Sequence, residues 1–256
     1  MRHPDLVENE SPRTRTAPSR KRTEPHLLDN PIWNSLLTEH SSLAISNRLA
    51  RRFPAAIGPL SGFPQQSAEN YEALRALAGP DGTVVLFCTE KPKPPAGWTT
   101  VTGGLLTQMV CEEAPADAPI HFNRGEEFRP LTTADVAEMV ALADLTKPGP
   151  FRDRTIELGA FFGIFEAGRL VAMAGQRLHL PHHVEVSAVC THPEARGRGY
   201  ARMLIATVME EIHQRGKIPF LHSFAHNASA VRVYESLGFR QRRTFELAVL
   251  KNGTRK

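Results

Sequence analysis

The most constraining feature of this sequence is a glycine- and arginine-rich turn that joins an apolar run to an amphipathic run. The apolar run Glu185–Thr191 ends at His192-Pro193, and a helical pattern begins directly after Gly199. A strand that leads through a turn into a helix leaves several backbone N–H groups free, and the helix dipole adds positive potential there. Glycine at Gly197 and Gly199 lets the backbone approach an anion closely. The turn therefore predicts a site for a phosphate-containing ligand.

Three arginines at this turn, Arg196, Arg198 and Arg202, add charge that suits a polyanion. The dinucleotide-binding fingerprint requires a third glycine where Arg202 stands. A nucleotide P-loop requires a Gly-Lys-Ser/Thr ending, which this turn lacks. Both motifs are therefore excluded, and the ligand has to be identified from the surrounding sequence.

The composition is that of an ordinary globular protein, with 41% hydrophobic and 23% charged residues. A net charge of +4 favours a small anionic ligand over nucleic acid. The three widely spaced cysteines fit neither a disulfide framework nor a zinc site, so we expect free thiols and no metal. No apolar run approaches the roughly 20 residues that cross a membrane, and Met1–Glu8 has no secretory core. We expect a cytoplasmic monomer or homodimer with no nucleic-acid or membrane partner.

Composition divides the chain into four segments. Residues 1–25 are basic and contain prolines, which predicts a disordered tail. Residues 26–112 contain helical and strand patterns that predict a smaller α/β domain. Residues 113–126 are acidic and rich in proline and alanine, as linkers are. Residues 127–256 form the second domain, whose pattern predicts a mixed sheet with helices packed on it.

Two motifs in the second domain resemble those of the GNAT superfamily of acyl-CoA-dependent N-acyltransferases. The first is R/Q-x-x-G-x-G/A, here Arg196-Gly-Arg-Gly199-Tyr-Ala201, and the second is Asn227-x-x-Ala230-x-x-x-Tyr234-x-x-x-Gly238-Phe239. The resemblance covers residues 127–250. It implies an α/β (α+β) fold with a mixed, mostly antiparallel central sheet flanked by helices, here preceded by a smaller domain.

The strand Glu185–Pro193 is similar to the subgroup with glycine N-acyltransferase-like C-terminal domains. That similarity would make the first domain a degenerate GNAT-like half that shapes the acceptor pocket.

The resemblance further implies acetyl-CoA as a co-substrate. The turn would hold the pyrophosphate through its backbone N–H groups, and the end of the preceding strand would hydrogen-bond the pantetheine arm. Asn227 would cap its helix beside that arm. The implied cofactor-binding residues are Val189, Cys190, Thr191, Arg196, Gly197, Arg198, Gly199, Tyr200, Ala201, Arg202 and Asn227.

Two catalytic residues are also implied. Tyr234 stands at the position of the family's tyrosine that protonates the departing thiolate. Glu185 stands where the histone-acetyltransferase branch has its general base, and alternation places it on one face of its strand with Ser187 and Val189. On an apolar strand we expect burial to raise the pKa of Glu185. A solvated carboxylate at the strand edge is the alternative. His222 and His226 are further candidates for lining the acceptor cleft.

The resulting hypothesis is an N-acetyltransferase that transfers an acetyl group to a primary amine of a small molecule, by direct attack in a ternary complex. One alternative is a protein acetyltransferase that acts on lysine or N-terminal amines. The other is a non-catalytic acyl-CoA-binding regulatory module.

Overall fold

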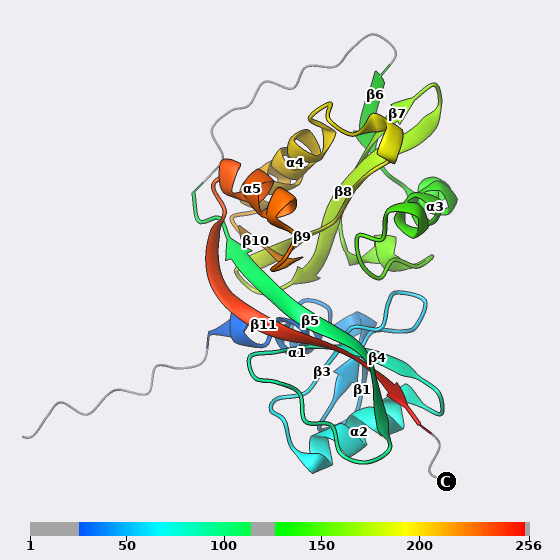
Figure 1. Ribbon diagram of the computed structural model, residues 1–256, viewed down its shortest axis with the longest axis vertical. Coiled ribbons are helices and arrows are strands. Elements are labelled where there is room, and N and C mark those ends of the chain that lie inside the picture. The colour runs from blue at the N-terminus through cyan, green and yellow to red at the C-terminus, as the bar shows by residue number, and fades with distance from the viewer. Residues whose placement is uncertain (1–25, 114–125, 254–256) are drawn as a thin grey trace, which may run out of the picture.

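The computed structural model describes residues 26–113 and 126–253. The predicted tail and nearly all of the predicted linker lie outside these ranges. Figure 1 shows two parts joined by the long curved strands β5 and β11. The strands are β1 (Ile45–Ser46), β2 (Arg51–Arg52), β3 (Ser61–Gly62), β4 (Thr83–Cys88), β5 (Trp98–Val110), β6 (Glu126–Pro130), β7 (Phe161–Glu166), β8 (Arg169–His179), β9 (His183–Thr191), β10 (Ile218–Phe224) and β11 (Arg240–Asn252). The helices are α1 (Pro31–Leu37), α2 (Ala68–Ala78), α3 (Val136–Thr146), α4 (Tyr200–Gln214) and α5 (Ala228–Ser236).

One eight-stranded sheet runs through both parts in the order β4-β11-β5-β10-β9-β8-β7-β6. Every neighbouring pair is antiparallel except β9 and β10. This confirms the predicted fold class. The predicted domain boundaries stay a prediction, but the sheet itself is continuous, because β5 from the first segment lies between β10 and β11 of the second.

Helix α4 forms because apolar side chains recur along one face of its sequence. Leu204, Ile205, Val208, Met209 and Ile212 are all buried against the sheet. Each such side chain contributes about 1.5–3 kcal/mol when it leaves water. Helix α3 packs in a separate cluster with β7 and β8, so helices cover both faces, as Figure 1 shows. None of the helices in the described ranges has the length and apolar character that crossing a membrane requires.

The first segment shares its core with the rest of the chain. Ile32 and Leu36 of α1 pack in one buried cluster with Leu178, Phe220 and Phe245, which come from β8, β10 and β11. Helix α2 packs on the other face of β4 in a cluster of its own. The first segment is therefore attached to the second by a shared sheet and a shared apolar core.

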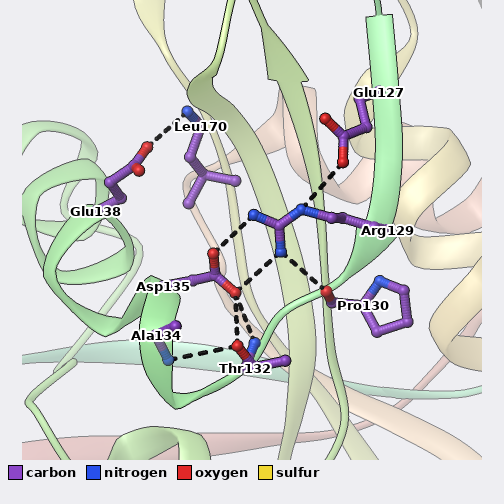
Figure 2. A network of polar contacts seen from close by, with 8 residues as sticks. All are labelled: Glu127, Arg129, Pro130, Thr132, Ala134, Asp135, Glu138 and Leu170. Atoms are coloured by element: carbon purple, nitrogen blue, oxygen red, sulfur yellow. Dashed lines mark hydrogen bonds and ion pairs between the residues drawn. The ribbon is translucent and has the colours of Figure 1, made fainter.

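An ion pair fixes the start of α3 against β6 (Figure 2). Arg129 donates two hydrogen bonds to the Asp135 carboxylate, at 2.7 and 3.0 Å. The Arg129 hydrogen bond is the largest cause that holds the pKa of Asp135 well below its usual range. Asp135 also accepts a hydrogen bond from the Thr132 backbone N–H in a capping box. This arrangement anchors the N-terminal end of α3 to β6.

Strands β9 and β10 separate soon after they pair. Their parallel register covers only three residue pairs and ends at Glu185↔Phe220. Beyond that point β10 continues along β5, and β9 continues along β8. The edge of β9 that faces β10 is therefore open from Val186 to Thr191, and this opening positions the site.

Candidate functional site

A cavity of about 700 Å³ lies at the opening between β9 and β10. Its lining comes from the β9 end, the turn before α4, helix α5, the loop after α3, and strands β4, β5 and β11. Of the predicted site residues, those that line it are Val189, Cys190, Thr191, Arg196, Gly197, Ala201, Asn227 and Tyr234. The fold thus brings most of the predicted site to one place.

The turn before α4 has the backbone conformation that glycine permits. Gly197 and Gly199 have φ angles of 80° and 81°, in the left-handed region. A Cβ built on either glycine would meet no atom within 4 Å, so the space in front of the turn is open. No described side chain caps α4, whose first backbone N–H groups have no partner within the helix. A helix N-terminus with these features is suited to binding an anion.

The charged side chains of the turn divide between the cavity and other partners. Arg196 lines the cavity. Arg198 instead forms an ion pair with Glu166 at 2.6 Å, and Arg202 hydrogen-bonds Ser236 and lines a second cavity. Tyr200 is buried, and burial raises the pKa of its hydroxyl. Arg198, Tyr200 and Arg202 are therefore not among the residues that line the cavity, and Arg196 is the arginine of this turn that lines it.

A β-bulge at Ala188 changes which side chains of β9 face which layer. Ala188 has φ 52°, and the register with β8 jumps between Ser187 and Cys190. Val186 and Val189 both pack in the cluster under α4, whereas Ala188 and Cys190 pack with α3. The predicted regular alternation is therefore wrong beyond Ser187, because the bulge inserts one extra residue.

The end of β9 offers backbone and hydroxyl groups. Burial raises the pKa of the Cys190 thiol to about 11, so the thiol stays protonated. The Thr191 hydroxyl oxygen is buried and has no hydrogen-bond partner within the described ranges. An unpaired buried polar atom that lines a cavity favours a polar ligand group there.

Glu185 is fully buried and paired. Arg177 donates from Nε to its Oε2 and from Nη2 to its Oε1, both at 2.7 Å. The His222 Nδ1 lies 2.6 Å from Oε1. Burial raises the pKa of Glu185, but the Arg177 charge and the hydrogen bonds from Arg177 and His222 outweigh it and lower the pKa to about 2. The expected upward shift is therefore wrong, because the charge of Arg177 and the hydrogen bonds from Arg177 and His222 outweigh burial.

The partners of Glu185 belong to a longer hydrogen-bonded chain. The His222 Nε2 lies 3.1 Å from the Gln108 amide nitrogen, which also donates to the Leu28 carbonyl oxygen at 3.0 Å. The Gln108 oxygen accepts from Arg242, which pairs with Asp29. Burial lowers the pKa of His222, so its ring is neutral, with Nδ1 donating to Glu185 and Nε2 accepting from Gln108.

Tyr234 lies on α5 and Asn227 lies directly before it, and both line the cavity. Asn227 caps the helix, because its side-chain oxygen accepts from the Ala230 N–H at 3.2 Å. Tyr234 lines the cavity and packs edge-to-face on Phe239. Burial raises the pKa of Tyr234 to about 12, which keeps the phenol protonated at neutral pH.

Several lining residues were not predicted from the sequence. They are Leu60, Val85, Phe87, Thr102, Gly103 and Leu106 from the first segment, Leu247 and Val249 from β11, and Arg177 from β8. A single arginine inside the apolar run Leu170–Leu180 was a signal that could have identified Arg177. Of the two histidines expected at the acceptor cleft, His222 lines the cavity and His226 does not. Both ring nitrogens of His222 are already used, on Glu185 and Gln108.

Comparisons with known proteins agree with this geometry. The FR47-like protein family matches residues 161–247. A solved structure from Novosphingobium aromaticivorans, named as an acetyltransferase from the GNAT family, has 40% identity and a TM-score of 0.81, covering 90% of this chain and 100% of that chain. None of the curated proteins matches this chain.

Two more distant structures share the fold. A GCN5-related N-acetyltransferase from Kribbella flavida has 16% identity and a TM-score of 0.58, covering 88% of this chain and 95% of that chain. A tandem GNAT protein from the clavulanic acid biosynthesis pathway has 15% identity and a TM-score of 0.54, covering 81% and 79%. From the identity and coverage of the Novosphingobium protein, together with the turn, the opened strands and the cavity, we conclude that this chain belongs to the GNAT family of acetyltransferases.

Proposed function

We propose that this protein transfers an acetyl group from acetyl-CoA to the primary amine of a small molecule. The observation that carries the proposal is one cavity that joins the turn before α4 to Tyr234 and to the apolar side chains of β4 and β11. Donor, acceptor and proton source can therefore meet in one space, as direct attack in a ternary complex requires.

The residues at the turn fit the donor. The left-handed glycines leave open space in front of the α4 N-terminus, where backbone N–H groups of residues 197–202 would hold a pyrophosphate. Arg196 would add charge there. The open edge of β9, with the unpaired Thr191 hydroxyl, would bind the amide-rich pantetheine arm. Acetyl-CoA, when bound, supplies a thioester that an amine can attack.

Tyr234 is assigned the role of general acid. Its high pKa keeps the hydroxyl protonated at neutral pH, and its place on the cavity wall lets it donate that proton to the departing thiolate. A phenol in a partly buried site is a suitable donor, because the thiolate that forms there is poorly solvated.

Glu185 is assigned a positioning role, and the amine would lose its proton to water. The Glu185 carboxylate is fully buried, both oxygens accept hydrogen bonds, and its low pKa makes it a weak base. A base role for Glu185 stays a prediction that these contacts do not favour.

A small acceptor is favoured by the far side of the cavity. Strands β4 and β11 supply Val85, Phe87, Leu247 and Val249 there, so the acceptor end is bounded by apolar side chains. A lysine on a protein surface would instead need an open groove that admits the flanking peptide. A cavity of about 700 Å³ is in the range typical of small-molecule sites.

A thiol-release assay tests the proposal directly. The full chain is incubated with acetyl-CoA, or with longer acyl-CoAs, and with a panel of small amines and lysine-containing peptides. We expect turnover with acetyl-CoA and small amines. Binding of CoA thioesters without turnover would support the regulatory-module alternative, and turnover confined to peptides would support a protein acetyltransferase.

A further inference from the structure

The charges around the cavity are of one sign. The charged side chains that line it are Lys147, Arg177 and Arg196, and no aspartate or glutamate of the described residues joins them. Glu185, the nearest buried carboxylate, is fully covered and faces Arg177 and His222. A cationic acceptor such as a polyamine would find no carboxylate to pair with, so the lining favours a neutral or anionic acceptor.

Arg177 is the cation at the acceptor end. Its Nε and Nη2 are both used on Glu185, whereas Nη1 has no hydrogen-bond partner within residues 26–113 and 126–253. The Arg177 side chain keeps 13% of its surface exposed, and it lines the cavity. The guanidinium carbon lies 5.7 Å from the centre of the Phe87 ring. One edge of the guanidinium is thus fixed and the other is free to donate.

The network behind Arg177 holds it in this orientation. Glu185 is itself fixed by His222, and His222 by Gln108, so the guanidinium is oriented before any ligand arrives. An arginine whose geometry is set in advance loses little entropy when it binds a planar anion. Because the pair with Glu185 is formally neutral, the contribution of Arg177 is a directed N–H donor more than a net charge.

Apolar side chains make up much of the cavity that Arg177 lines. Phe87, Leu60, Val85 and Leu106 line the same cavity from the first segment, and Leu247 and Val249 line it from β11. A ligand that satisfies both features has a carboxylate for Arg177 and an apolar body for these side chains. An amine of that kind is an apolar α-amino acid.

We propose that Arg177 binds the carboxylate of the acceptor, and that the acceptor is an apolar α-amino acid. This inference rests on the proposed acetyl transfer. In that reaction the amine nitrogen forms a bond to the acetyl carbon, and the carbon–sulfur bond breaks. The thiolate takes a proton from Tyr234, the nitrogen loses one to water, and water returns a proton to the Tyr234 phenolate. The carboxylate stays unchanged and serves only to orient the amine.

Matched acceptors test the proposal on the full wild-type chain. L-leucine, 3-methylbutylamine and spermidine are compared by thiol release with acetyl-CoA, since 3-methylbutylamine is leucine without its carboxylate. We expect kcat/KM for leucine to exceed that for 3-methylbutylamine by at least about 10-fold, as expected for a hydrogen bond to a charged group. Equal values, or a preference for spermidine, would overturn the inference while leaving acetyl transfer intact. No turnover with any amine would contradict the proposed function and the inference together.

The Arg177→Lys variant gives a second readout. Lysine keeps a positive charge for Glu185 but loses the planar edge that carries Nη1. We expect the ratio of kcat/KM for leucine to that for 3-methylbutylamine to fall at least about 10-fold, mainly through KM for leucine. A thermal melt confirms folding of the variant. A folded variant with the wild-type ratio would contradict carboxylate binding by Arg177.

Discussion

The two ends of the cavity are built in different ways. The proposed donor end consists of a short contiguous segment, Arg196–Ala201, whose backbone would bind the cofactor and whose glycines permit its shape. The acceptor end consists of side chains from β4, β5, β8, β10 and β11, held by a buried hydrogen-bonded network. Backbone binding at one end suits a ligand shared across a family, whereas side-chain binding at the other end suits a ligand that differs between members.

The largest loss in the free energy of unfolding is expected from breaking the hydrogen-bonded network of Arg177, Glu185 and His222 at the acceptor end. Arg177→Ala would leave Glu185 buried without its cationic partner, which costs about 3–5 kcal/mol in the free energy of unfolding. Urea unfolding measures this. Arg215→Ala removes a partly exposed ion pair with Glu211 on α4 and is the matched control, with an expected loss of at most about 1 kcal/mol. Equal losses in the two variants would show that the network is not stabilising.

Protonating Glu185 at low pH should lower the free energy of unfolding by less than Arg177→Ala does, because a protonated Glu185 can still accept hydrogen bonds. The pKa of Glu185 is lowered in the folded protein from an ordinary value of 4.5 to about 2. Its contribution to stability is therefore complete above pH 4.5 and is lost as the pH falls toward 2. Unfolding free energies measured across this range should fall less steeply in Glu185→Gln than in the wild type. Parallel curves would contradict the lowered pKa.

Tyr234 lines the cavity, and removing its hydroxyl should affect only the chemical step. Tyr234→Phe is expected to lower kcat by about 100-fold, because the variant lacks the proton donor for the thiolate. The Kd for CoA should stay close to the wild-type value. Tyr71→Phe, at a buried tyrosine that hydrogen-bonds Gln66 away from the cavity, is the control. Wild-type kcat in Tyr234→Phe would remove this residue from the mechanism.

The smallest changes in stability and ligand affinity are expected from substitutions at the donor end. Gly197→Ala and Gly216→Ala each place alanine at a left-handed φ with no neighbour within 4 Å, so each should lose about 1–2 kcal/mol of stability. Only Gly197→Ala adds a methyl group to the proposed phosphate site, which should weaken CoA binding by about 10-fold. Scanning calorimetry on both variants measures the loss of stability caused by backbone strain, and titration calorimetry measures the affinity for CoA. Equal CoA affinities would indicate that the pyrophosphate lies elsewhere.

The donor end could be predicted from sequence because its determinants are local. The strand, the turn and α4 follow one another directly, and glycine at positions 197 and 199 is readable without any long-range contact. Helix α5 with its Asn227 cap is local in the same way.

The acceptor end could not be predicted because its determinants are long-range. The insertion of β5 between β10 and β11 pairs residues more than a hundred positions apart, which no local pattern encodes. The bulge at Ala188 places alanine at a positive φ, against its own preference, so tertiary pairing imposes it. The pKa of Glu185 shifts downward because Arg177 and His222 approach it from two other strands.

Calorimetric titration with CoA and with pantetheine tests the central claim that the turn before α4 binds a pyrophosphate. Pantetheine keeps the arm that would lie along β9 and lacks the pyrophosphate. We expect CoA to bind with a Kd between about 1 μM and 1 mM, and pantetheine to bind at least about 10-fold more weakly. The absence of any heat with CoA, or equal affinities for the two compounds, would contradict the account.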